Sequence, residues 1–303
     1  MNRLVTFSSF GGPEVLELNE APEPHPGSGE LRVRVAAVSL NPLDWKIINS
    51  SDVAQAFNVT PPAGFGHDLA GVVDEVGQDT RGFNVGDRVA GGALGAALAD
   101  YVVVKAGNIY SIPDALDYAT AATIPIAGMT AAAVMDTLKI ESGETLLIGG
   151  AGGGVGIFLI QLAKLVGAKV IGTCSESTFP FLKDLGAEPI SYGLGLTERA
   201  RKASPHIDAA ADLVGTETVY TALELGVDPK RIATIAAGPN PPGGAVPTGG
   251  GNAPKASASR IIDAIVTGKL RVPIAARFPM EKIREAVTMQ QDGHVHGKIL
   301  IEL

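Results

Sequence analysis

The sequence has a single cysteine, no excess of basic charge and no long unbroken apolar run, and each shortage excludes a class of protein. Its single cysteine, Cys174, excludes an intramolecular disulfide and a cysteine-rich zinc knuckle. A chain without disulfides fits a reduced compartment, so we expect a cytoplasmic protein. Acidic residues outnumber basic ones, 32 to 24, which argues against a nucleic-acid partner.

Membrane and secretion signals are also missing. The most apolar region, residues 146–171, is interrupted by glycines and by Lys164 and Lys169, so it does not predict a membrane span. The first residues, "MNRLVTFSSFGG", contain no apolar run followed by a small-residue cleavage site, so no signal peptide is expected. We therefore expect no membrane partner.

The chain has the length and apolar content of about two globular domains. It has 303 residues, of which 46% are hydrophobic and 18% charged, which is enough apolar material for large cores. Residues 1–117 show short alternating runs such as "GELRVRVAAVSL", separated by turn signals, which is typical of a barrel or sandwich of strands. A helical and strand pattern returns at the C-terminus in 258–303, where the last strand could pair with the N-terminal domain.

From residue 118 to 257 the pattern changes to strands alternating with helices. Examples are "TLLIGG", "GIFLIQLAKLVG" and "KVIGTC", which indicate βαβ units in a parallel sheet. The fold class predicted is α/β, with a central parallel sheet and a mostly-β N-terminal domain onto which the C-terminal strand could pair. Within the central region, residues 238–254 are rich in Gly and Pro and look unsuited to a regular strand.

The stretch "ETLLIGGAGGGVGIFLIQLAK" contains a glycine-rich turn between a predicted strand and a predicted helix. Gly153 would let the backbone approach a pyrophosphate, and Gly156 would let the helix pack closely on its strand. Glycines alone are weak evidence in a chain with 38 of them. The flanking strand, helix and second strand make a dinucleotide site the better interpretation.

The end of the second strand bears on the choice of cofactor. NAD-binding folds place an acid roughly 20 positions after the glycines to bind the ribose 2′-hydroxyl. Ser175 stands near that position, and its hydroxyl leaves room for the 2′-phosphate of NADPH. Tyr192 could donate to the same phosphate, or could be an ordinary strand tyrosine. Glu176, one residue further, would restore an acid, but with Ser175 at the expected position we favour NADPH over NADH.

Several motifs, in order along the chain, resemble one family. "FGGPEVLEL", "NPLDWK", "GHDLAGVVDEVG", "VGDRVAG", "IAGMTA", "GAGGGVG", "LGAE" and "GKILIEL" are similar to the medium-chain dehydrogenase/reductase superfamily, in its zinc-independent quinone oxidoreductase (zeta-crystallin-like) branch. The likeness covers essentially the whole chain. It implies a mostly-β GroES-like catalytic domain formed by both termini, a central Rossmann domain with a doubly wound parallel sheet, and a reductase of quinones or α,β-unsaturated carbonyls, for which we expect NADPH.

The resemblance also implies roles for single residues. Asn41 stands where this branch has an asparagine near the nicotinamide. Lys46, close after it, departs from the tyrosine that related quinone reductases often have there; it is our candidate proton donor, with a solvated lysine and solvent as proton source as the alternative. His67 resembles the histidine of the zinc alcohol dehydrogenases, but the thiolate ligands are missing, so no metal is expected. Thr130 matches a threonine near the nicotinamide ribose, or could be an ordinary helix residue.

The full set of site predictions has two parts. The catalytic candidates are Asn41 and Lys46. The cofactor-binding candidates are Asn41, Thr130, Gly150, Gly152, Gly153, Gly154, Val155, Gly156, Ser175, Tyr192, Leu213, Val214, Ala236 and Gly238.

Two other functions remain open: an enoyl or ketone reductase of a biosynthetic pathway, and an NADPH-binding redox sensor without turnover. The expected partner is a small quinone or enone. The resemblance implies a homodimer, although the Gly/Pro-rich segment departs from the part of the family that forms it.

Overall fold

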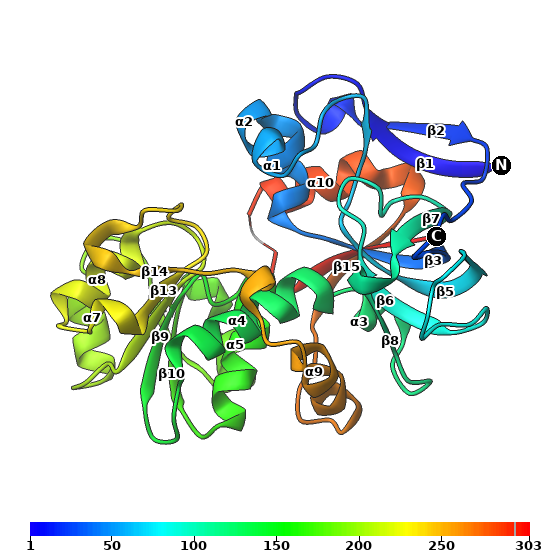
Figure 1. Ribbon diagram of the computed structural model, residues 1–303. Coiled ribbons are helices and arrows are strands. Elements are labelled where there is room, and N and C mark those ends of the chain that lie inside the picture. Colours follow the sequence, from blue (N-terminus) through cyan, green and yellow to red (C-terminus); the bar gives the residue numbers. More distant parts are fainter. Residues whose placement is uncertain (294) are drawn as a thin grey trace. The chain divides into compact units, whose positions relative to one another are not determined.

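The computed structural model describes residues 1–293 and 295–303, which form two compact units (Figure 1). The terminal unit consists of Met1–Ile126 and Ile274–Leu303, and the central unit of Ala127–Pro273. These borders lie further along the chain than the predicted ones after residues 117 and 257. The difference assigns helix α3 (Tyr118–Ala121) to the terminal unit and helix α9 (Ser257–Val266) to the central unit.

The central unit contains a six-stranded parallel sheet in the order β11-β10-β9-β12-β13-β14. The order reverses between β9 and β12, so the sheet is doubly wound, which confirms the predicted fold class. The strands are β9 (Thr145–Gly149), β10 (Lys169–Cys174), β11 (Glu188–Ser191), β12 (Ala209–Asp212), β13 (Ile232–Thr234) and β14 (Val246–Pro247).

Helices cover both faces of this sheet, with α4 and α5 on one side and α7 and α8 on the other (Figure 1). Strand β9 is buried at every residue, as expected for a parallel strand covered on both faces. The helices are α4 (Met129–Leu138), α5 (Gly154–Leu165), α6 (Phe179–Asp184), α7 (Leu196–Ala203) and α8 (Glu217–Glu224), followed by α9.

The Gly/Pro-rich segment 238–254 holds more regular structure than its composition indicated. Val246 and Pro247 form β14, which pairs in parallel with β13. Pro247 lacks a backbone N–H and β14 lies at the sheet edge, where proline is tolerated. The expectation that this segment has no regular strand is therefore wrong for these two residues.

The terminal unit is built from two sheets. One is a three-stranded sheet, β2-β1-β4, and the other has the order β15-β16-β3-β5-β6-β8, with β7 also paired to β3. The strands are β1 (Asn2–Phe7), β2 (Glu17–Ala21), β3 (Glu30–Leu40), β4 (Ala63–Gly64), β5 (Asp68–Val76), β6 (Arg88–Gly92), β7 (Tyr101–Lys105), β8 (Ile109–Ser111), β15 (Ile274–Pro279) and β16 (Lys298–Glu302).

The last strand pairs back onto the N-terminal part of the chain, as predicted. Strand β16 runs antiparallel to β3, with Ile299 opposite Leu40 and Ile301 opposite Val38. The helices of this unit are α1 (Pro42–Asn49), α2 (Ser51–Ala56), α3 and α10 (Ile283–Gln291). Among the described residues, no helix has the length and apolar character needed to cross a membrane.

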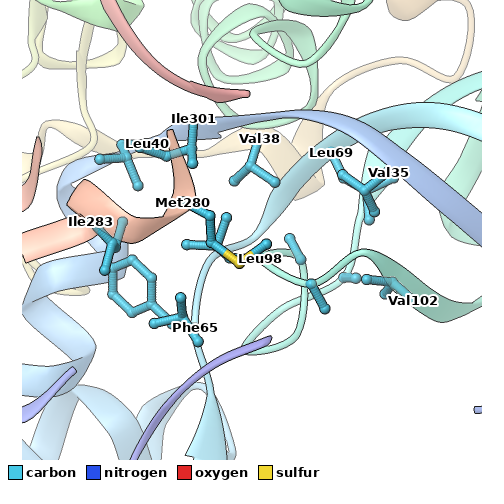
Figure 2. Packing of buried hydrophobic residues seen from close by; sticks show 14 of the residues in the cluster. Val35, Val38, Leu40, Phe65, Leu69, Leu98, Val102, Met280, Ile283 and Ile301 are labelled. Carbon is cyan, nitrogen blue, oxygen red and sulfur yellow. The ribbon is translucent and has the colours of Figure 1, made fainter. Parts of the chain in front are cut away.

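The main core of the terminal unit lies against one face of the large sheet. Figure 2 shows Val38, Leu40, Leu69 and Ile301 packed with side chains from other elements, among them Ile283 of α10. Because strand side chains alternate between faces, residues one step away, such as Ser39 and Asp68, are directed to the opposite face. The opposite face of the same strands therefore carries polar side chains, whereas the core face is apolar.

Candidate cofactor and active sites

The glycine-rich turn of the central unit follows β9 and leads directly into α5. Gly150 adopts φ +73°, a backbone conformation that favours glycine, and its N–H donates to Thr173 Oγ1 at 3.1 Å. Gly153 is the N-cap of α5, so no side chain caps the helix. The first backbone N–H groups of an α-helix have no carbonyl partner within the helix, so those of Gly154 to Gly156 are available to an anion.

The glycines of this turn serve two different purposes. A Cβ at Gly156 would lie 2.3 Å from the carbonyl oxygen of Ala151, so this glycine allows α5 to pack against the turn. A Cβ at Gly153 would meet only the Gly150 oxygen, at 3.5 Å. The fold itself leaves room at Gly153, as expected where a pyrophosphate approaches the backbone. These residues fit a dinucleotide cofactor.

The structure brings Leu213 and Val214 to this turn. The Leu213 N–H donates to the Gly149 oxygen at 3.2 Å, and a Cβ at Gly150 would lie 2.2 Å from Val214 Cγ2. Both residues follow β12, the strand beside β9 where the sheet order reverses. Ligands of doubly wound sheets bind at the carboxyl ends of the strands at this switch point.

Ser175 and Tyr192 follow two neighbouring parallel strands of the sheet. Cys174 and Ser191 are register partners, so Ser175 and Tyr192 leave adjacent strands at the same edge. The Ser175 hydroxyl lies 2.8 Å from Thr178 Oγ1 and 3.0 Å from Ser177 Oγ. Three hydroxyls therefore gather where the ribose of a dinucleotide is expected.

Ala236 and Gly238 follow β13, and the loop that carries them is organised by two residues the sequence reasoning missed. Thr234 Oγ1 accepts the backbone N–H groups of Ala236 and Ala237 and donates to Asp212 Oδ2 at 3.0 Å. Asp212 is buried, and burial raises the pKa of its carboxyl. The only sequence signal for it was an acid at the end of the otherwise apolar "DAAAD" run.

Thr130 lies in the first turn of α4 and is buried. A Cβ at Gly250 would lie 3.3 Å from Thr130 Oγ1, so the Gly/Pro-rich segment passes close over this threonine. The same segment contacts α4 again through Thr248, whose hydroxyl lies 3.0 Å from Thr137 Oγ1. This segment therefore forms part of the surroundings of Thr130.

In the terminal unit, Asn41 is the N-cap of α1 and is 2% exposed. Its Nδ2 donates to Asp68 Oδ2 at 2.8 Å and to the Ser39 oxygen at 3.1 Å, and its Oδ1 accepts from Lys298 Nζ at 2.6 Å. Its backbone N–H donates to Asp44 Oδ2 at 2.7 Å. Two acids and one lysine thus surround one asparagine inside the protein.

Burial sets the protonation of this cluster. It raises the pKa of Asp68 to about 8 and that of Asp44 to about 7, and the Lys298 charge opposes both shifts. Burial also lowers the pKa of Lys298, against the attraction of the two acids. The cluster can therefore hold or release a proton near neutral pH. Asp44, Asp68 and Lys298 were not among the predicted site residues.

Lys46 and His67 lie in different surroundings from this cluster. Lys46 is exposed on α1, with its Nζ 5.8 Å from the centre of the Trp45 ring. Burial lowers the pKa of His67 to about 4, so the imidazole is neutral at ordinary pH. Its Nδ1 is buried, and no described residue forms a hydrogen bond with it.

Comparison with known proteins identifies the relatives of this chain. Residues 27–114 match the family described as alcohol dehydrogenase GroES-like domain, and residues 185–301 match zinc-binding dehydrogenase. The quinone-oxidoreductase QR1 of Triphysaria versicolor, a chloroplastic protein, is 30% identical over 99% of this chain and 98% of its own length. The acryloyl-coenzyme A reductase of Sulfurisphaera tokodaii is 28% identical over 94% of this chain and 96% of its own.

Solved structures agree with this relationship. The quinone oxidoreductase of Coxiella burnetii superposes with a TM-score of 0.89 at 29% identity, covering 100% of this chain and 99% of its own. The resemblance found in the motifs is thus confirmed across the whole length. The chain belongs to the medium-chain dehydrogenase/reductase superfamily, in its quinone oxidoreductase branch, and is an oxidoreductase of a family that binds a nicotinamide cofactor.

Proposed function

We propose that this protein is an NADPH-dependent, zinc-independent reductase of quinones or α,β-unsaturated carbonyls. The observation that carries the choice of cofactor is the hydroxyl cluster of Ser175, Ser177 and Thr178 beside the glycine turn. Neutral hydroxyls can donate to a 2′-phosphate, whereas an acid at Ser175 would repel it. Tyr192, 59% exposed on the adjacent strand end, offers a further donor.

The reaction needs a hydride donor, and a reduced nicotinamide supplies the hydride when it is bound. The turn from Gly150 to Gly156 would hold the pyrophosphate, and Thr130, Leu213, Val214, Ala236 and Gly238 are the proposed contacts of the remaining cofactor. Asn41 is the proposed neighbour of the nicotinamide. Lys46, exposed on α1, is the proposed donor to the oxygen that gains negative charge.

Zinc independence is supported by the Lys298 ammonium, which already donates a hydrogen bond to Asn41. The resemblance aligns Asn41 with a metal-binding cysteine of the zinc alcohol dehydrogenases, and here its oxygen accepts a hydrogen bond from the Lys298 ammonium. A metal ion at this oxygen would have to displace or repel that charge. In the part of the chain that the structure describes, no three His, Cys, Asp or Glu side chains are grouped to hold a metal ion.

Two variants at the end of β10 test the cofactor assignment. Ser175→Asp should weaken NADPH binding by about tenfold to a hundredfold through repulsion of the 2′-phosphate, and should leave NADH binding nearly unchanged. Glu176→Gln is the matched control, because it changes the neighbouring acid and should not weaken NADH binding. Equal losses for both cofactors in Ser175→Asp, or a selective loss of NADH binding in Glu176→Gln, would contradict the assignment.

A second candidate is an enoyl thioester reductase, favoured by the likeness to the acryloyl-coenzyme A reductase. It would use the same cofactor with a different acceptor, because fold and cofactor site do not determine the substrate. A panel of simple quinones, short enones and enoyl-CoA thioesters, assayed by loss of the absorbance of reduced nicotinamide, separates the two. Cofactor binding without oxidation on any acceptor would instead indicate the redox-sensing alternative.

The resemblance to the family leads us to propose also that the protein forms a homodimer. Strand β14 is the edge strand of the central sheet, but it has two residues and ends in Pro247, which leaves little backbone for pairing with a second copy. Sedimentation velocity of the full chain would test it: a species of twice the chain mass supports the dimer, and a single species of 31.0 kDa contradicts it.

A further inference from the structure

Buried polar side chains form a stripe on the face of the large sheet opposite the main core. Ser39 and Asp68 are direct partners in the β3–β5 ladder, and Leu300 of β16 is the partner of Ser39. Because side chains alternate along a strand, Lys298 lies on the same face as Leu300 and Ser39. The strand register therefore brings a cation and an acid to this face from opposite sides of β3.

Asn41 joins the two charged residues of this stripe. The Lys298 ammonium can only donate, so it requires the amide oxygen, and Asp68 Oδ2 accepts from the amide nitrogen. Lys298 also donates to the Leu40 oxygen at 2.9 Å, which anchors the ammonium to the backbone next to Asn41. These contacts allow only one of the two amide orientations.

The polar atoms of the Asn41 side chain are all engaged in this arrangement. Both hydrogens of Nδ2 are used, one by Asp68 and one by the Ser39 oxygen. Oδ1 accepts from Lys298, and the side chain also faces the Asp44 backbone N–H in the capping box of α1. The surrounding protein therefore fixes the direction of the amide.

Burying the Lys298 ammonium costs free energy, so its presence here indicates a specific role. The residue is 3% exposed, and removing an ammonium from water carries a large desolvation penalty. A methionine would fill similar space without that penalty. The ammonium adds a charge-assisted hydrogen bond that sets the direction of the Asn41 amide.

We propose that Lys298 is a positioning residue, which with Asp68 holds the Asn41 amide in the one orientation that the reaction needs. This inference rests on the proposed function, in which Asn41 lies beside the nicotinamide. It assigns to Lys298 an effect on the reaction that is exerted entirely through Asn41.

A double-mutant cycle tests that dependence. Lys298→Met should lower kcat/KM by about tenfold to a hundredfold, because the amide loses its fixed direction. In an Asn41→Ala background, Lys298→Met should have almost no further effect. The proposal would be overturned if the loss of kcat/KM in the double variant equalled the product of the two single losses. An unchanged kcat/KM in Lys298→Met would overturn it as well.

A matched control separates positioning from general stability. Arg32 is another buried cation of the terminal unit, 8% exposed on β3 and paired with Asp74. Arg32→Met should lower the melting temperature and leave kcat/KM of the folded protein unchanged. Should Lys298→Met fail to fold, Lys298→Met combined with Asp68→Asn removes both charges while keeping an acceptor for the Asn41 amide. This double variant should fold and show the same kinetic loss, and normal kinetics in it would overturn the proposal.

An NMR readout keeps the inference separate from the proposed reaction. The side-chain NH2 signals of Asn41, assigned by their absence in Asn41→Ala, should exchange with solvent far more slowly than those of the exposed Asn84. Lys298→Met should speed this exchange by at least about tenfold. Unchanged exchange would overturn the role of Lys298, whereas an inactive wild type with the expected exchange would contradict only the proposed function.

Discussion

At the scale of single residues, burial and the neighbouring charged groups decide what each side chain can do. The buried Asn41 amide is held between Lys298 and Asp68, so its orientation is fixed. Lys46, five residues further along the chain, is exposed to solvent. Two candidates from one short motif thus have opposite environments.

Lys46 can be tested by removal of its ammonium. Lys46→Ala should lower kcat by about tenfold to a hundredfold while leaving the NADPH dissociation constant nearly unchanged, because the proposed contact is with the substrate oxygen. Steady-state kinetics and cofactor titration measure the two quantities. Lys105→Ala, which removes another exposed lysine of the terminal unit, should leave both unchanged. An unaltered kcat in Lys46→Ala would make Lys46 a solvated surface lysine.

His67 should make stability depend on pH in the acid range. Its pKa is lowered to about 4 in the folded protein, below the ordinary value of 6.5, because burial disfavours the charged form. As the pH falls from 6.5 toward 4, the unfolded chain gains a proton that the folded chain does not, so folding stability decreases. The loss from this group is about 3 kcal/mol and is complete below the folded pKa.

Denaturant unfolding of the wild type and His67→Gln at a series of pH values measures this effect. The stability difference between the two proteins should change in favour of His67→Gln as the pH falls through this window. An imidazole pKa near 6.5 in the folded protein, measured by NMR, would contradict the burial argument.

At the scale of elements, the turn between β9 and α5 combines packing and binding in adjacent glycines. Gly156 has backbone atoms of Ala151 where a Cβ would be, whereas a Cβ at Gly153 would make only an ordinary contact with the Gly150 oxygen, at 3.5 Å. Helix α5 has 12 residues, so its N-terminus presents aligned peptide dipoles as well as free N–H groups.

Two alanine substitutions separate these roles. Gly156→Ala should lower the free energy of unfolding by about 1–3 kcal/mol, because the added methyl group overlaps the Ala151 carbonyl. Gly153→Ala should keep the melting temperature of the wild type and lose NADPH affinity by about tenfold or more, because the methyl group occupies the place of the pyrophosphate. Thermal unfolding and cofactor titration of both variants measure the effects. Full NADPH affinity in Gly153→Ala would contradict the cofactor site.

Local sequence patterns were sufficient to predict most strands and helices, but not to predict contacts between residues distant in sequence. The strands and helices around the glycine turn were predictable because strand, glycines and helix are consecutive, from "TLLIGG" to "KVIGTC". Helix α7 was missed, because its "TERARK" face is charged and only Leu196 and Ala200 are buried. The partners of Asn41 were missed because Asp68 and Lys298 lie 27 and 257 residues away along the chain and reach it through strand register.

At the scale of the whole molecule, each compact unit carries its own part of the chemistry. The central unit has the switch point of a doubly wound sheet with its glycine turn, and the terminal unit has a buried acid–amide–lysine cluster. The terminal unit is formed by both ends of the chain because β16 completes the sheet beside β3. That return was predictable from the final apolar strand "GKILIEL", whereas the borders at residues 126 and 273 depend on which unit α3 and α9 pack against.

The measurement that tests the central claim most directly is the oxidation of NADPH and of NADH by the wild-type chain, in parallel, with one simple quinone as acceptor. We expect turnover with NADPH at a kcat/KM at least about tenfold above that with NADH, in protein treated with a chelator as well as in untreated protein. Turnover that requires added zinc, equal use of the two cofactors, or NADPH binding without oxidation would contradict an NADPH-dependent, zinc-independent quinone reductase.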